Sequence, residues 1–382
     1  MKGLVSIYLD VFRFLAAMGV FLAHAHSFPN SSGALPDIYV RHQCVVVFFV
    51  ISGYVIAASA TRPGRTLANY GADRLARLYS VVIPALLLTY CLDAIGSMLC
   101  PAVYSYISPQ WQPVRLLVNM FYCQQIWFLC VNPSSNTPFW SLGYEFWYYV
   151  LFGVWFFVGP KWKKSLLLLA VSLFIGPKIL LLLPAWAIGA IAFRATQGYR
   201  CSYRSSLVLF VATGLVMAAA LYFADQPGLS NSNVGKAPWF YSANFLADNV
   251  FAVIVALHFF CCGLLSKHLA SNLEPYWIVK TIRWMSGHTF SLYVYHLPIL
   301  LFIRSIGNYN PEDPWEDLVA IVITLLIIVG LSKITEEKYP AIRIPLRRWM
   351  ENLARRFEGS AVETDARLAP RPIPAGTKPE RN

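Results

Sequence analysis

The sequence predicts an all-α fold, a polytopic membrane bundle of about ten transmembrane helices. Composition is the first observation behind this prediction: 57% of the 382 residues are hydrophobic, only 13% are charged, and the mean hydropathy is +0.52. The second is that apolar runs of roughly 18 to 22 residues recur along the chain, which is the length of a helix that crosses the hydrocarbon. Third, the stretches between the runs are short and polar, so no large soluble module is expected.

The spans follow one another with short connections. In order they lie near 11–30, 43–60, 78–99, 139–158, 165–177, 179–193, 205–224, 242–265, 286–304 and 317–334. The fifth and sixth are short, and a run of about 12 residues does not cross the hydrocarbon alone. The segment 165–193 is therefore either two spans or one broken or re-entrant hairpin about Pro177.

Basic residues gather after the even-numbered spans and before the odd-numbered ones. They are Arg62, Arg65, Arg74, Arg77, Lys161, Lys163, Lys164, Arg194, Arg200, Arg204, Lys267, Lys280 and Arg283. By the positive-inside rule these segments and both termini are expected to be cytoplasmic. The rule also accounts for most of the net charge of +12, so no nucleic-acid partner is expected.

Two further features bound the organisation. We expect a transmembrane domain over 1–335 and a cytoplasmic tail over 336–382, disordered from about 359, where Pro, Gly, Ala and charged residues dominate. The eight cysteines show no paired metal-ligand spacing, so no metal site is expected. Cys100, Cys123 and Cys130 fall in one long segment, where a disulfide and unpaired thiols both stay open.

The first span carries ionisable residues in "FRFLAAMGVFLAHAHSF", residues 12–28. His24 lies eleven positions after Arg13, which brings both to within about 20° of one helix face. Asp10 lies three residues before Arg13 and can pair with it. Such residues inside a membrane are expensive and indicate function. The alternative is that Arg13 snorkels to the surface and His24 bonds to a neighbouring helix.

The fourth span contains a buried acid in "FWSLGYEFWYY", residues 139–149. Glu145 lies one turn after Ser141, and Tyr148 and Tyr149 follow three and four residues later on the same side. The carboxylate is expected to face a polar cavity, which Ser141 and Tyr148 can also line, whereas an interfacial belt of Trp and Tyr is the simpler explanation of the aromatic residues. His296 lies at a comparable depth in "SGHTFSLYVYHLPI". It either completes that cavity or binds a carbonyl freed by Pro298.

Two arginines lie just before the third span. Arg74 and Arg77 are three residues apart, so both guanidiniums share a helix face and can hold an anionic ligand. Positive-inside charge or lipid headgroup contact explains the pair equally well.

Five blocks of sequence resemble, in the same order, those of the acyltransferase 3 family of integral-membrane acyltransferases. They are "LDVFRFLAAMGVFLAH", "FFVISGYVIA", "RLARLYSVVIP", "FWSLGYEFWY" and "SLYVYHLPI", and the resemblance covers roughly residues 8 to 335. It implies transfer of an acetyl or other short acyl group from a cytoplasmic coenzyme A thioester to a hydroxyl of a cell-envelope or secreted glycan. It also implies a bacterial inner membrane and membrane lipids as partners.

The resemblance carries over residue by residue. The arginine and histidine of the family fall on Arg13 and His24, its arginine pair on Arg74 and Arg77, and its buried glutamate on Glu145. The "SG" block falls on Ser52 and Gly53, whose plain role is close helix packing.

Acyl transfer chemistry gives these residues roles. His24 is expected to be the general base, and Arg74 and Arg77 to bind the phosphates of acetyl-CoA, which is a co-substrate and not a bound cofactor. Arg13 orients the donor or stabilises charge on the carbonyl oxygen. Glu145 orients His24 or binds the acceptor glycan or glycolipid, and both stay open. Direct transfer is favoured over a covalent acyl-enzyme on a histidine or on Ser141.

These roles require Arg13, His24 and Glu145 to line one cavity. We therefore expect the first and fourth spans to be neighbours, with Glu145 turned towards His24 at the same level within about one turn. A proton-coupled transporter and a non-catalytic binder are the alternatives, since buried His, Glu and Arg suit both. The oligomeric state is not predicted.

Overall fold

The structure, a computed structural model, describes residues 3–26, 40–224, 236–269, 276–306, 309–310 and 313–368. Every regular element in these ranges is a helix, which confirms the all-α class. Six helical stretches there are long and apolar enough to cross a membrane: Leu4–His26, Arg41–Ala60, Leu67–Leu99, Tyr203–Ala224, Phe245–Ser266 and Pro314–Leu353. The chain is an integral membrane protein, but the count of about ten spans is not confirmed.

The helices follow the predicted runs closely. The first half of the chain forms α1 (Leu4–His26), α2 (Arg41–Ala60), α3 (Leu67–Leu99), α4 (Gln112–Met120), η1 (Thr137–Phe139), α5 (Trp140–Phe157), α6 (Lys161–Ile175), α7 (Pro177–Leu181) and α8 (Leu183–Gly198). The second half forms α9 (Tyr203–Ala224), η2 (Phe240–Ser242), α10 (Phe245–Ser266), α11 (Tyr276–Gly287), α12 (Thr289–Ser305), α13 (Pro314–Ile334), η3 (Glu336–Lys338) and α14 (Tyr339–Leu368).

Helices α1 and α3 begin well before their predicted spans, by about two turns or more. Helix α1 begins at Leu4, so Asp10 and Arg13 lie inside it. Helix α3 begins at Leu67, after Thr66 caps it by accepting a hydrogen bond from the Asn69 backbone N–H at 3.2 Å. Arg74 and Arg77 are therefore part of one continuous helix with the third span, and their side chains enter the bundle.

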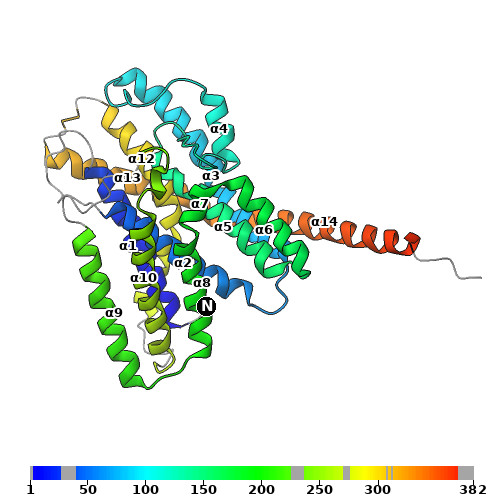
Figure 1. Cartoon of the computed structure of the whole chain (residues 1–382). Coiled ribbons are helices and arrows are strands. Elements are labelled where there is room, and N and C mark those ends of the chain that lie inside the picture. The colour runs from blue at the N-terminus through cyan, green and yellow to red at the C-terminus, as the bar shows by residue number, and fades with distance from the viewer. Residues whose placement is uncertain are drawn as a thin grey trace, which may run out of the picture.

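Helices α1, α2, α8, α10 and α12 form the middle of the bundle, and α9 lies at its edge (Figure 1). The closest approach is between α2 and α8. A Cβ on Gly53 would lie 2.0 Å from the Trp186 carbonyl oxygen, and one on Gly189 would lie 2.0 Å from that of Val50. Only glycine fits at such a crossing, which confirms the packing role predicted for Gly53.

The segment 165–193 is broken rather than continuous. Helix α6 ends at Ile175. The next residue, Gly176, has a φ of 78° that favours glycine, and Pro177 begins the five-residue α7 before α8. The break lies where the sequence predicts it.

Helix α14 packs against α3 and then projects away from the bundle (Figure 1). Three residues of the predicted tail, Glu336, Arg343 and Met350, therefore lie against α12 or α3 of the membrane domain. The structure continues α14 to Leu368, whereas the sequence predicts disorder from about 359; residues 369–382 lie outside the described ranges.

All eight cysteines are free, including Cys100, Cys123 and Cys130. Burial raises the pKa of the Cys123 and Cys130 thiols, which favours their protonated and less reactive form. Of the two alternatives for Cys100, Cys123 and Cys130, a disulfide or unpaired thiols, the structure shows unpaired thiols.

Candidate functional site

A polar pocket of about 90 Å³ lies inside the bundle between α1, α2, α3, α5 and α12. We call it the arginine pocket. Its polar lining consists of Arg13, Ser52, Arg74, Arg77, Ser141, Glu145, Thr289, Tyr149 and Tyr293. It brings together five of the residues that the sequence singles out, from three helices.

The carboxylate of Glu145 is held by hydroxyl groups. Ser52 Oγ donates to Glu145 Oε1 at 2.8 Å, and the Tyr149 hydroxyl donates to the same oxygen. Ser52 Oγ in turn accepts from the Trp186 indole N–H at 3.2 Å. This chain of bonds fixes the carboxylate from α2, α5 and α8. Sequence reasoning missed this role of Ser52, and it placed Tyr149 on the same side as Glu145 without choosing it as a cavity residue.

The arginines of the pocket differ in their partners. Arg13 pairs with Asp10 at 3.3 Å, as the three-residue spacing predicts, and Asp10 also accepts from Arg283 at 2.9 Å. Arg74 lies over the Tyr149 ring, 6.0 Å from its centroid. The Arg74 Nε is buried and has no hydrogen-bond partner in the part of the chain that the structure describes. A buried guanidinium N–H without an acceptor suits an anionic ligand.

A second pocket of about 290 Å³ adjoins the first, because Arg13, Arg74 and Arg77 line both. We call it the entrance pocket. Its other walls come from α11, η3 and α14, with Glu336, Glu337 and Tyr339. Glu336 accepts hydrogen bonds from the backbone N–H (3.0 Å) and hydroxyl (2.9 Å) of Ser291, at the start of α12. The sequence assigns Glu336 to the tail and misses this role.

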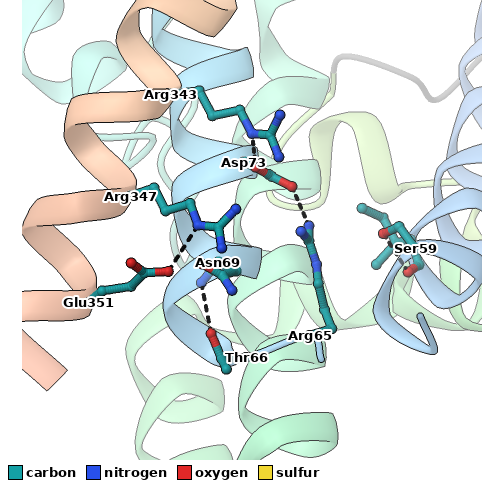
Figure 2. A network of polar contacts seen from close by, with 9 residues as sticks. Ser59, Arg65, Thr66, Asn69, Asp73, Arg343, Arg347 and Glu351 are labelled. Carbon is teal, nitrogen blue, oxygen red and sulfur yellow. Dashed lines mark hydrogen bonds and ion pairs between the residues drawn. The ribbon is translucent and has the colours of Figure 1, made fainter. Parts of the chain in front are cut away.

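An ion-pair clamp joins α14 to α3 beside the entrance pocket. Figure 2 shows Asp73 between Arg65, before α3, and Arg343 on α14. Arg347 instead pairs with Glu351 within α14, at 2.9 Å. Since Asp73 precedes Arg74, the clamp holds α14 against the turn of α3 that carries Arg74 and Arg77.

A third pocket of about 280 Å³ lies at the other end of α1. We call it the histidine pocket. It is lined by His24, Arg41, His42, Trp140, Tyr241 and Tyr293, among others. The Trp140 ring stacks on His42 and on Tyr241, with centroid distances of 5.7 Å and 4.3 Å.

A buried histidine and a carboxylate pair beside the histidine pocket. His42 Nε2 pairs with Asp248 Oδ2 at 3.0 Å, and both side chains are buried. Sequence reasoning missed this pair, although a histidine in the first turn of a span was a visible signal.

The tautomer of His24 follows from its hydrogen bonds. His24 Nδ1 lies 2.8 Å from the Val20 carbonyl oxygen, and His296 Nδ1 lies 3.0 Å and 2.9 Å from those of Leu292 and Tyr293. Carbonyl oxygens only accept, so both Nδ1 atoms carry hydrogen. His296 Nε2 then accepts from His24 Nδ1 at 3.3 Å. This leaves Nε2 of His24 as its basic nitrogen.

His296 thus accepts a hydrogen bond from Nδ1 of His24, on the opposite edge of the ring from the basic Nε2, and does not bind the carbonyl that Pro298 frees. Proline at 298 removes the backbone donor for the Val294 carbonyl. The Asn136 side-chain amide donates to that oxygen at 2.8 Å. His296 lies at the depth of His24, as predicted, but it lines neither the arginine pocket nor the histidine pocket, and the alternative role at the kink belongs to Asn136.

The expectation of a single cavity needs correction. Glu145 and Arg13 line the arginine pocket, whereas His24 lines the histidine pocket, and Val45 and Tyr293 line both. The physical reason is the helix order: α1 packs mainly on α2 and α12, and α2 meets α5. Glu145 is therefore turned to Ser52 on α2, not to His24.

Tyr293 forms the wall between the two pockets. Its hydroxyl donates to the Pro138 carbonyl oxygen at 2.7 Å and accepts from Ser141 Oγ at 2.7 Å. The predicted cavity residue Ser141 is thus bonded to this wall.

The prediction for Tyr148 is wrong, because its hydroxyl donates to the Ile179 carbonyl oxygen at 2.8 Å on another side of α5. Tyr149 takes the expected place.

The fold and the site define an integral membrane protein whose helical bundle contains pockets lined by ionisable residues. A family model described as an acyltransferase domain matches residues 6–333. The chain belongs to the acyltransferase 3 family, which confirms the resemblance and makes the protein a transferase.

A curated relative is the O-acetyl transferase of Shigella phage Sf6, which is 28% identical over 156 residues. That alignment covers 38% of this chain and 44% of the relative, so the chain spans less than half the length of the curated relative it matches. No solved structure matches the chain significantly. Within the described ranges, no group of three or more His, Cys, Asp or Glu side chains is placed to hold a metal ion.

Proposed function

We propose that the protein is a membrane O-acyltransferase that moves a short acyl group, most simply acetyl, from a coenzyme A thioester to a hydroxyl of a glycan or glycolipid. One observation carries the proposal: three arginines line two adjoining pockets, and a histidine with a basic Nε2 lines a third across a shared wall. The family supports acyl transfer, and the curated relative is named for O-acetyl transfer.

The donor enters at the entrance pocket. Coenzyme A carries several phosphate charges, and forked guanidiniums bind phosphates well. Arg74 brings an unpartnered buried Nε, and Arg77 lies one turn further along α3. The pantetheine arm then extends through the arginine pocket and places the thioester at Tyr293. By the positive-inside rule, the entrance pocket faces the cytoplasm of a bacterial inner membrane, with both termini on that side.

The acceptor hydroxyl enters at the histidine pocket. Its oxygen bonds to the thioester carbonyl carbon while His24 Nε2 takes its proton. Collapse of the tetrahedral intermediate breaks the C–S bond, and the coenzyme A thiolate leaves and takes the proton from His24. The products are an ester and free coenzyme A. His296 holds the ring of His24 in the required tautomer.

Arg13 and Glu145 act on the donor side in this scheme. Arg13 lines both the arginine pocket and the entrance pocket, where it can orient the donor. Glu145 is bonded to Ser52 and Tyr149, and Tyr149 lies under Arg74. We therefore assign Glu145 to positioning of the donor arginines, since Tyr293 and Val45 separate it from His24.

The test uses purified full-length protein in lipid nanodiscs with acetyl-CoA and a panel of hydroxylated glycans. Free thiol should be released only when an acceptor is present, together with an ester on the acceptor detected by mass spectrometry. A proton-coupled transporter or a non-catalytic binder releases no thiol with any donor or acceptor.

A further inference from the structure

A fourth pocket, far more apolar than the others, lies between α2, α5, α6 and α8. We call it the lateral pocket, and its volume is about 430 Å³. Its lining is aromatic and aliphatic except for Thr61, Ser172 and Arg194. The proposed reaction uses neither the pocket nor Arg194.

The lateral pocket opens on the side of the bundle. Two of its lining residues, Trp155 and Ile191, are 49% and 59% exposed. Exposed apolar side chains on the side of a membrane-spanning bundle face hydrocarbon. An apolar cavity open to hydrocarbon is suited to an acyl chain.

One end of the lateral pocket is positively charged. Arg194 lies in the last turns of α8, and Thr61 directly follows α2. Helix α6 begins at the same end and carries Lys161, Lys163 and Lys164 in its first turn. Its position follows from the end of α5, where Phe157 contacts Tyr70 in the first turns of α3, the helix that follows Thr61 and the end of α2. Basic residues at the end of an apolar cleft complement an anionic headgroup.

We propose that the lateral pocket binds one acyl chain of an anionic phospholipid, with the phosphate at Arg194. The occupant then touches Trp186, which lines the pocket. The Trp186 indole N–H donates to Ser52, and Ser52 donates to Glu145. The bound lipid therefore supports the arrangement of Glu145 from outside the arginine pocket; this second step rests on the proposed function.

The binding step is tested by native mass spectrometry, which needs no enzyme activity. The full-length protein is equilibrated with equal amounts of palmitoyl-oleoyl phosphatidylglycerol and palmitoyl-oleoyl phosphatidylcholine in detergent, and retained lipid is counted. The wild type should retain phosphatidylglycerol preferentially. Ala187→Phe fills the pocket and should abolish retention, whereas Ala212→Phe, at an exposed position on α9, should not.

The headgroup assignment has its own variant pair. Arg194→Gln should lower the preference for phosphatidylglycerol about fivefold, the effect of one basic residue near a headgroup, whereas the exposed Arg200→Gln should leave it unchanged. Unchanged retention in Ala187→Phe, or an unchanged preference in Arg194→Gln, overturns the proposal. If Ala187→Phe is not monodisperse on gel filtration, Arg194→Gln alone decides.

The link to Glu145 is tested separately in the thiol-release assay. Ala187→Phe should change kcat or KM for acetyl-CoA, while Ala212→Phe should not. Altered lipid retention with unaltered kinetics overturns the link and leaves the lipid site standing. Absent thiol release in the wild type overturns the proposed function, and the link with it, but not the lipid site.

Discussion

Ion pairs surround the entrance and arginine pockets, whereas at the histidine pocket the ring of His24 is held by a backbone carbonyl and a second imidazole ring. Arg13, Asp10 and Arg283 form one ion-pair group, and Asp73 joins Arg65 to Arg343 in another. His24, in contrast, bonds to the Val20 carbonyl and to His296.

The difference matches the two tasks that we propose for the two ends. Binding an anion needs positive charge whose position is fixed, and ion pairs with carboxylates fix it without neutralising every arginine. Proton transfer needs a ring whose tautomer is fixed, and carbonyl acceptors fix it without adding charge. Variants at the two ends should therefore separate donor binding from chemistry.

The largest expected effect is at the histidine end. His24→Ala should lower kcat by about 10² to 10⁴, because a positioned general base contributes that factor, while the protein still accumulates in the membrane. The measurement is thiol release at saturating donor and acceptor. His26→Ala is the control and should stay active; a dead His26→Ala beside an active His24→Ala contradicts the assignment.

The second effect is at the arginine end. Arg74→Ala and Arg77→Ala should each raise KM for acetyl-CoA about tenfold or more, since a hydrogen bond to a charged group contributes about 1.5–3 kcal/mol. KM for the acceptor should change much less. Equal changes in KM for acetyl-CoA and KM for the acceptor argue that the two arginines have a structural role. The separation of donor binding from proton transfer would then be wrong.

A smaller effect on kcat is expected at Tyr293, the wall between the arginine pocket and the histidine pocket. Ser141→Ala removes one hydrogen bond to Tyr293 and should lower kcat less than tenfold, because such a bond contributes about 0.5–1.5 kcal/mol. Intact-protein mass spectrometry during turnover should detect no acylated enzyme. An acyl-serine, or a loss as large as that of His24→Ala, speaks for transfer through Ser141.

The smallest effect is expected at the clamp. Arg343→Ala removes the ion pair with Asp73 and should raise KM for acetyl-CoA a few-fold, because α14 then packs less firmly against the entrance pocket (Figure 2). Arg347→Ala is the matched control, since its pair with Glu351 is exposed, lies within α14 and contributes little. If both variants behave alike, the clamp does not support the donor site.

Part of the site could be predicted from spacing along one helix. Asp10 and Arg13 are three residues apart and pair as expected, and Glu145 faces a polar pocket because apolar surroundings would leave its charge uncompensated. The choice between Tyr148 and Tyr149 could not be made this way. Both lie one turn from Glu145, and only the position of α2 decides which one shares the pocket.

The sequence alone determined the class of the protein: a helical membrane protein with expensive ionisable residues inside its spans, because apolar length and charge placement are properties of the chain. Tertiary structure decided which of those residues meet. It placed His24 beside His296, separated it from Glu145 by Tyr293 and Val45, and brought Glu336, from the predicted tail, to the donor arginines. Helix order and rotation about each axis make these contacts, and the packing of distant helices sets both.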